Sequence, residues 1–130
     1  MRRDTLTLHT ARGAHRIDIE VAESDREKAY GLMFRQSLGE NEGMLFPYPT
    51  AHEITMWMRN TFISLDMIFI RADGIVHRIE TDTEPHSERI IASKGDVTGV
   101  LEMKAGSARR LGLKPGDRVE HPHFKSPTKR

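Results

Sequence analysis

Alternation of apolar and polar residues near the start of the chain predicts a β-hairpin. Leu6 and Leu8 alternate with threonines, and the apolar residues of 17–21 alternate with acidic ones, on either side of Arg12-Gly13. A period of two puts successive side chains on opposite faces of a sheet, which is typical of a strand with one buried face. Similar runs predict further strands at 44–46, 52–58, 65–70, 75–81, 97–103 and 118–121.

A capping box predicts a helix after the hairpin. The Ser24 hydroxyl can accept a hydrogen bond from a first-turn N–H, and Glu27 can reach back to the N–H of Ser24. We expect Gly31 to lie inside this helix, where it costs about 1 kcal/mol relative to Ala and indicates close packing against a strand. The buried stripe of the helix should consist of Ala29, Leu32 and Met33.

Glycine and proline mark the remaining turns. Asp73-Gly74 predicts a two-residue type I′ hairpin, and Pro115-Gly116 fits the two central positions of a type II turn. Gly112 should end a short helix over 107–111. Pro47-Tyr48-Pro49 should end the strand 44–46, because proline has no N–H to donate to a sheet. The elements together predict an α+β protein that is mainly antiparallel β, with two short helices.

The chain of 130 residues shows no repeat or linker, so we expect one domain. Its core should run from about residue 4 to 121, with His121 and His123 exposed at the start of a solvated basic tail, 122–130. Hydrophobic residues make up 37% and charged residues 30%, which is typical of a soluble globular protein. No run reaches the roughly 18 apolar residues of a membrane span, and residues 1–10 lack the apolar core of a signal peptide. We expect no transmembrane segment, and a cytoplasmic location for the chain as given or a periplasmic or envelope location if a leader was removed.

Charge and cysteine content exclude several classes of function. Lys and Arg number 20 against 19 for Asp and Glu, so a net charge of +1 predicts no general attraction to nucleic acid or anionic lipid. The absence of cysteine removes disulfides, thiolate zinc sites, iron–sulfur clusters and cysteine nucleophiles. There is also no phosphate-binding glycine-rich loop and no serine-nucleophile motif. We expect no cofactor, no metal and no nucleic-acid partner.

Asp66 is the most informative acidic residue. It lies in the strand 65–70, which is apolar on both faces, so its carboxylate should be buried on the same face as Ile68 and Ile70. A buried charge needs hydrogen-bond donors, and the neighbouring turn Arg59-Asn60-Thr61 offers several. We favour this structural interpretation over the alternative of a general acid, a general base or a ligand anchor at a cleft beside the turn.

Glu102 stands between two apolar residues of a predicted strand. It should face away from Leu101 and Met103, and we favour a solvated surface there. The alternatives are a pair with an arginine, or a two-carboxylate site with Asp66.

Met56-Trp57-Met58 permits a metal-binding interpretation. In a strand both thioethers lie on one face, together with His52, and soft sulfur ligands select Cu(I). We favour the simpler interpretation, in which the two methionines fill the core.

A series of short motifs runs along most of the chain: Gly31-Leu32-Met33-Phe34-Arg35, Gly43-Met44-Leu45-Phe46, Met56-Trp57-Met58-Arg59-Asn60-Thr61, Leu65-Asp66-Met67-Ile68-Phe69-Ile70, Asp73-Gly74, Val100-Leu101-Glu102, Ala105-Gly106 and Gly116-Asp117. Taken in order, these motifs resemble those of DUF192, a family of small bacterial and archaeal domains of unknown function. The resemblance implies a compact, mainly β, barrel-like fold with a small helical contribution and no established reaction. By matching position, the polar residues embedded in the motifs are our candidate ligand-binding residues: Arg35, Asn60, Thr61, Asp66 and Glu102.

The leading hypothesis is a small non-enzymatic binding or accessory domain. Its polar pocket, formed by the Asn60-Thr61 turn, Asp66 and Arg35, would hold a small ligand or a partner's peptide. One alternative is an acid/base hydrolase or lyase that uses Asp66 and Glu102. The other is a Cu(I)-binding protein that uses Met56 and Met58.

Overall fold

The computed structural model describes residues 1–125, in which seven strands form one sheet of order β5-β4-β6-β3-β2-β1-β7. Neighbouring strands are antiparallel except β2 and β3, which run parallel. No helix of the described residues is both long and apolar enough to cross a bilayer. The elements are β1 Arg2–Thr10, β2 Gly13–Val21, α1 Asp25–Tyr30, β3 Glu42–Met56, β4 Leu65–Ile70, β5 Val76–Glu80, β6 Ile91–Lys104, α2 Ser107–Leu111 and β7 Arg118–Glu120.

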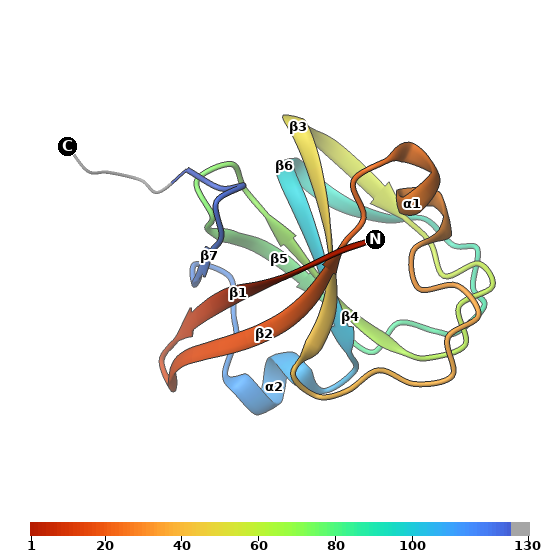
Figure 1. Cartoon of the computed structure of the whole chain (residues 1–130), viewed down its shortest axis with the longest axis horizontal. Helices are drawn as coiled ribbons and strands as arrows, with labels where there is room; N and C mark the ends of the chain where they lie inside the picture. Colours follow the sequence, from red (N-terminus) through yellow and green to blue (C-terminus); the bar gives the residue numbers. More distant parts are fainter. Residues whose placement is uncertain (126–130) are drawn as a thin grey trace.

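The sheet curls into a half-barrel (Figure 1). The two edge strands of the sheet, β5 and β7, approach each other, and Ile75 just before β5 forms an isolated bridge with Arg118 of β7. The N–H of Val119 donates to the carbonyl of Gly74 at 2.7 Å at the same place. The α+β class with a barrel-like sheet and two short helices is therefore confirmed.

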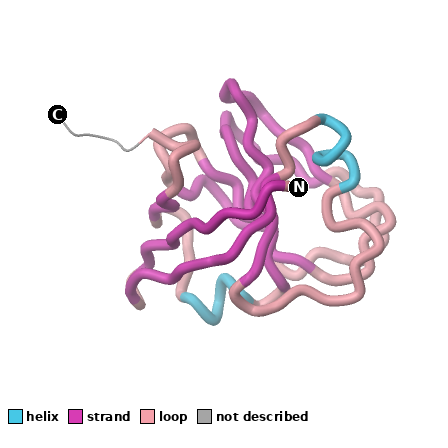
Figure 2. The backbone as a smooth tube through the Cα atoms, in the orientation of Figure 1, coloured by secondary structure: helices cyan, strands magenta, loops and turns pink. Residues whose placement is uncertain are grey.

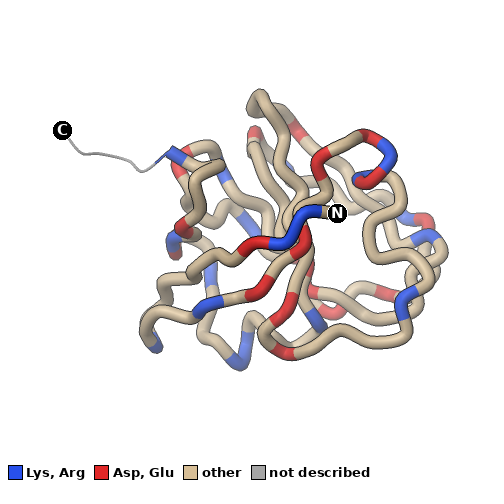
Figure 3. Tube along the Cα trace, viewed as in Figure 1, with Lys and Arg blue, Asp and Glu red and all other residues tan. Residues whose placement is uncertain are grey.

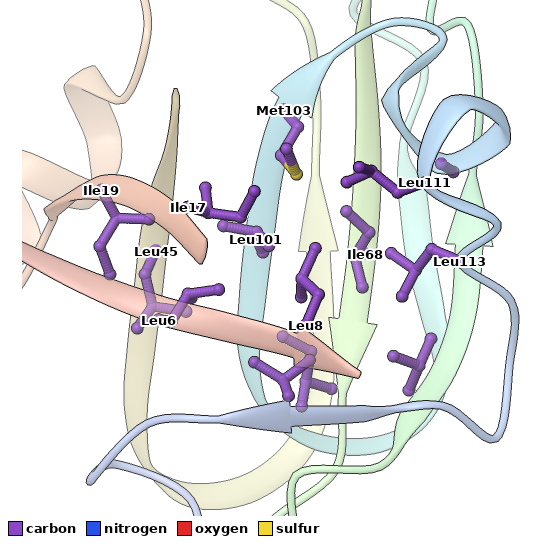
Figure 4. Packing of buried hydrophobic residues seen from close by; sticks show 14 of the residues in the cluster. Leu6, Leu8, Ile17, Ile19, Leu45, Ile68, Leu101, Met103, Leu111 and Leu113 are labelled. Carbon is purple, nitrogen blue, oxygen red and sulfur yellow. The ribbon is translucent and has the colours of Figure 1, made fainter. Parts of the chain in front are cut away.

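Each face of the sheet carries its own hydrophobic cluster. Figure 4 shows the first cluster, in which side chains of β1, β2, β4 and β6 meet residues of α2 and of the segment after it. The second cluster lies on the opposite face and includes Leu32, Phe46, Met58 and Ile91. Alternate residues of the central strands β4 and β6 belong to different clusters, as a period of two requires.

Two predicted hairpins are present, but one has a different turn. The β1–β2 hairpin is as predicted. Between β4 and β5, a type I′ turn would need positive φ at two central residues, whereas Gly74 at 87° is alone among residues 71–75 in having one. Its N–H donates to the carbonyl of Arg71 at 2.9 Å, so the connection is a type I turn followed by a left-handed glycine. The predicted type I′ turn was wrong.

The β3 strand does not stop at its prolines. It runs on from Pro47 through to Met56, so the predicted strands 44–46 and 52–58 are one strand. Its register against β6 shifts between Pro47 and His52, and a second shift follows between Glu53 and Thr55. Such irregularities remove the need for a ladder hydrogen bond at each proline, so the strand can bend and continue.

The α1 helix is shorter than predicted. Its capping box is present, with the Glu27 N–H donating to Ser24 Oγ at 3.0 Å. Gly31, expected inside the helix, caps its end with a φ of 52°, and Ala29 is exposed, so the predicted buried stripe was wrong. The expected close packing is present, because a Cβ at Gly31 would lie 3.4 Å from the Phe46 ring.

The predicted start of the basic tail belongs to the folded body. Phe124 is buried in the first cluster, and the N–H of Lys125 donates to the carbonyl of Ala72 at 3.0 Å. His121 is buried beside Asp4, with 2.9 Å between Nε2 and the carboxylate, and His123 is half-buried. The expected exposure of both histidines was therefore wrong. The rest of the predicted tail, 126–130, lies outside the described residues.

Candidate functional site

Long loops gather on one side of the half-barrel (Figure 2). Backbone hydrogen bonds tie three of them together: the N–H of Phe34 donates to the carbonyl of Asn60 at 2.9 Å, and the N–H of His86 donates to that of Thr61 at 3.0 Å. The loops therefore hold one another in place over the second hydrophobic cluster.

A cleft of about 290 Å³ lies between these loops, α1 and β3. Glu102 of β6 and Leu65 of β4 come from the central strands and form its floor. Apolar and aromatic side chains form its walls, and two cations lie among its lining residues. The walls include Phe46, Tyr48, Met56, Trp57 and Met58, and the cations are Lys28 and Arg59.

Glu102 is the buried acid of this cleft. Its strand neighbours in register are Met44 and Met67, and only 4% of the residue is exposed. Within residues 1–125 its carboxyl group has no hydrogen-bond partner or ion pair. Burial raises the pKa of Glu102 from 4.5 to about 8, because the charged form loses its hydration. The predicted solvated position was wrong, since α1 and the loops cover this face.

Tyr48 and the two cations shape the upper part of the cleft. The pKa of Tyr48 is raised to about 12. Burial is the main cause, and the nearby carboxylates of Glu102 and Asp25 add to it because they would repel the negative charge of a phenolate. The Lys28 Nζ lies 4.9 Å from the centre of the Tyr48 ring and donates to a backbone carbonyl. Arg59 stacks over Trp57 in the same way, at 5.3 Å. Both aromatic rings therefore already contact a cation.

Asp66 lies on the other face of the sheet. It is fully buried, as predicted, but its hydrogen-bond donors are not the 59–61 turn. Its carboxylate accepts from the backbone N–H groups of Asp82 at 3.1 Å, Gly106 at 3.2 Å and Ala108 at 3.0 Å. The last two belong to the start of α2, where Gly106 has no side chain to cap the helix. Asp66 therefore caps a helix that is distant in sequence.

The two candidate acids do not share a site. Asp66 pairs in register with Met103 and points to the first cluster, whereas Glu102 pairs with Met67 and points to the second. A direct acid/base pair needs both carboxyl groups in one cavity, so the structure does not bring the predicted pair together.

The other three candidate residues have different surroundings. Thr61 is buried and lines the cleft, and its hydroxyl donates to the carbonyl of Arg59 at 3.1 Å. Asn60 is exposed with a φ of 54°, which asparagine tolerates better than most residues, so it shapes the turn through its backbone. Arg35 forms an ion pair with Glu20 away from the cleft. The predicted pocket of Arg35, Asn60, Thr61 and Asp66 is therefore not formed, and Thr61 alone of the four lines the cleft.

The proposed Cu(I) ligands are also separated. Met56 and Met58 both line the cleft, but His52 does not, and its Nδ1 lies 2.9 Å from the carbonyl of Thr50. The Met58 sulfur accepts a hydrogen bond from Thr83 at 3.2 Å. Across residues 1–125, no group of three or more His, Asp or Glu side chains is placed to hold a metal ion.

Sequence reasoning did not identify Lys28, Tyr48 or Trp57 as residues of the site. Trp57 was considered only as the residue between two methionines and as a member of a family motif, and Tyr48 only as part of a strand end. The capping box fixes where α1 begins, but no local pattern shows that Lys28 lies over Tyr48, because that contact joins two distant elements.

Comparisons with known proteins show the family of the chain and agree with its fold. The model of the DUF192 family, described as "Uncharacterized ACR", matches residues 7–121. A crystal structure of a candidate transcription regulator from Sinorhizobium meliloti 1021 has a TM-score of 0.91 at 40% identity, covering 95% of this chain and 96% of that chain. A crystal structure of a protein of unknown function from Novosphingobium aromaticivorans DSM 12444 has a TM-score of 0.89 at 41% identity, covering 92% and 85%. No curated protein matched the chain.

Proposed function

The chain belongs to the DUF192 family, and we propose that it is a small non-enzymatic binding domain whose cleft over Glu102 takes a small ligand. One observation carries this proposal: Glu102 is buried at the floor of an open cleft and has no partner among the described residues. The carboxyl oxygens of Glu102 make no hydrogen bond to the described residues and are not fully enclosed by them, so a ligand in the cleft can reach them and complete their hydrogen bonding.

The make-up of the cleft supports a ligand with both polar and apolar parts. Phe46 and Met58 offer apolar surface, whereas Thr61 and Glu102 offer polar atoms. Binding sites for small molecules commonly combine apolar walls with a few polar groups that fix orientation. The volume of about 290 Å³ is at the small end for such sites, which favours a small ligand over a partner's peptide.

Binding is a better proposal than catalysis on this geometry. A hydrolase or lyase of the acid/base type needs a second group near the first, and Asp66 is engaged with three backbone N–H groups on the opposite face. Its carboxylate therefore serves α2 rather than the cleft.

A screen of small metabolites by thermal unfolding tests the proposed function. We expect some compounds to stabilise the wild type and to lose that effect in Glu102→Met, which replaces the carboxyl group by an apolar side chain of similar length. Arg35→Gln is the matched control, because Arg35 lies outside the cleft, and it should respond as the wild type does. A screen without stabilising compounds, or with compounds that stabilise Glu102→Met equally, would contradict the proposal.

We also propose that the domain does not bind nucleic acid through its overall charge. The net charge is +1, and Figure 3 shows basic and acidic residues interspersed along the chain. The description of the Sinorhizobium protein as a regulator concerns that protein. Fluorescence anisotropy with a labelled DNA duplex at low salt should show no binding, and salt-sensitive binding would refute this part of the proposal.

A further inference from the structure

We propose that the ligand of this cleft is a small carboxylic acid with an apolar body, whose carboxylate accepts a hydrogen bond from Glu102. This inference rests on the proposed function and adds the chemical class of the ligand. It is argued from the contacts of Glu102, from the charges around the cleft and from the nature of its walls.

Glu102 is a hydrogen-bond donor at neutral pH. Its register neighbours on the adjacent strands, Met44 and Met67, supply no polar partner. Burial raises the pKa of its carboxyl group to about 8, so the group is protonated at neutral pH. A protonated carboxyl group carries one O–H, and that O–H has no acceptor among residues 1–125. The group that completes the site must therefore bring an acceptor, and a carboxylate forms one of the stronger bonds of this kind.

The charged groups that line the cleft favour an anion over a cation. Lys28 and Asp25 come from α1, Arg59 comes from the segment after β3, and Tyr48 of β3 is a neutral phenol. With Glu102 protonated, these lining groups carry one positive charge in excess. Arg59 also lies 3.9 Å from Glu88, which does not line the cleft, and solvent screens that exposed pair. A carboxylate is attracted to that excess, whereas an ammonium ion is repelled by it.

The aromatic rings also argue against a cationic ligand. Sites for ammonium ions place the ion over the faces of aromatic rings. Here Lys28 already lies over Tyr48 and Arg59 over Trp57, so a ligand cation would have to displace them.

The walls require an apolar body next to the carboxylate. Phe46, Met56, Met58 and Leu65 present hydrocarbon and thioether surface to the cleft. Burying an apolar chain or ring against them supplies binding energy that a very small acid such as acetate cannot obtain.

Two probes with the same skeleton, 3-phenylpropionate and 3-phenylpropylamine, test the inference. Binding is measured from NMR shifts of the Trp57 indole N–H, since Trp57 lines the cleft. We expect the acid to bind at pH 6.5 and to lose affinity by about tenfold or more at pH 9.5. At the higher pH, ionised Glu102 can no longer donate a hydrogen bond and repels the acid. The amine should not bind at either pH.

Variants separate the role of Glu102 from other effects of pH. Glu102→Gln keeps an N–H donor that cannot ionise, so its affinity for the acid should no longer change between the two pH values. Glu102→Met has no donor and should bind the acid roughly tenfold more weakly than the wild type at pH 6.5. Arg35→Gln is the control outside the cleft and should follow the wild type.

Two results would overturn the carboxylic-acid assignment. The first is amine binding that strengthens above pH 8 and is lost in Glu102→Gln, which would make the cleft a cation site and leave the proposed binding function intact. The second is a failure of the acid to shift the Trp57 signal at pH 6.5. The metabolite screen then decides separately whether the cleft binds another class of ligand.

Discussion

Asp66 and Glu102 are two buried acids on adjacent strands of one sheet, and they differ in almost everything but burial. Asp66 accepts hydrogen bonds from three backbone N–H groups and holds the start of α2 in place. Glu102, on the opposite face, has no partner among the described residues and forms the floor of a cleft. Burial alone therefore does not reveal what a carboxyl group does. The hydrogen bonds that it makes, or lacks, separate a structural acid from a candidate binding group.

Removing Asp66 should produce the largest loss of stability. Asp66→Ala leaves three N–H groups without their acceptor, including that of the buried Ala108, and removes the cap of α2, so we expect the free energy of unfolding to fall by about 4 kcal/mol. Urea unfolding followed by circular dichroism measures the change. Asp18→Ala, at an exposed strand position, is the control and should change stability little. A loss below about 1 kcal/mol for Asp66→Ala would show that the capping interaction is not important.

Replacing Glu102 should have the opposite sign. The unfolded side chain ionises near pH 4.5 and the folded one near 8, so folding takes up a proton between these values and wild-type stability falls as the pH rises through them. Glu102→Gln cannot ionise and should escape this loss. At about 1.4 kcal/mol per pH unit, it should be more stable than the wild type by roughly 3 kcal/mol at pH 7 and about equal to it near pH 4.5.

Urea unfolding of both proteins from pH 4.5 to 8.5 measures this difference. The exposed acid Glu53 of β3 provides the control, and Glu53→Gln should follow the wild type at every pH. If the stability of Glu102→Gln changes with pH as that of the wild type does, the pKa of Glu102 is not raised in the folded protein.

The cap of α1 should contribute less than that of α2. Ser24→Ala removes the side-chain oxygen that accepts from Glu27 at the helix start, which typically costs about 1 kcal/mol. Because α1 forms one wall of the cleft, the same variant should also weaken binding of 3-phenylpropionate. Ser37→Ala, at an exposed loop position, is the matched control for both measurements. Equal behaviour of the two serine variants would contradict this prediction.

Arg35→Gln should have the smallest effect. It breaks the ion pair with Glu20, and ion pairs that solvent can reach contribute about 0.5 kcal/mol. Urea unfolding in low and high salt should show this small loss shrinking as salt is added. A loss above about 2 kcal/mol would mean that Arg35 does more than pair with Glu20.

The two helix caps show which parts of the fold could be predicted from the sequence. The capping box of α1 joins residues three positions apart, so it could be identified, whereas Asp66 reaches an N–H group 42 positions away. Strands with clear alternation, such as β1 and β2, were predicted for the same local reason. The passage of β3 through Pro47 was not, because the register shifts that permit it depend on the partner strand β6.

The candidate site was predicted only in part. Glu102 and Thr61 line the cleft, and both were chosen by their place in the family motifs. The burial of Glu102 could not be deduced, because it depends on how α1 and the loops cover one face of the sheet. Asp66 was correctly expected to be buried, but its hydrogen-bond donors were not correctly predicted. They are backbone N–H groups of Asp82 and of the start of α2, whereas the turn 59–61 was chosen because it is close to Asp66 in sequence.

The pairing of the first strand with the last has a consequence for how the chain folds. Leu8 of β1 pairs with Val119 of β7, roughly 110 residues later. Contacts between such distant residues slow folding, and sheets dominated by them typically fold in milliseconds to seconds. During synthesis, the outer edge of β1 must wait until the segment around Val119 has left the ribosome. Until then that edge has unpaired N–H and C=O groups, which is the state in which strands of different chains can join and aggregate.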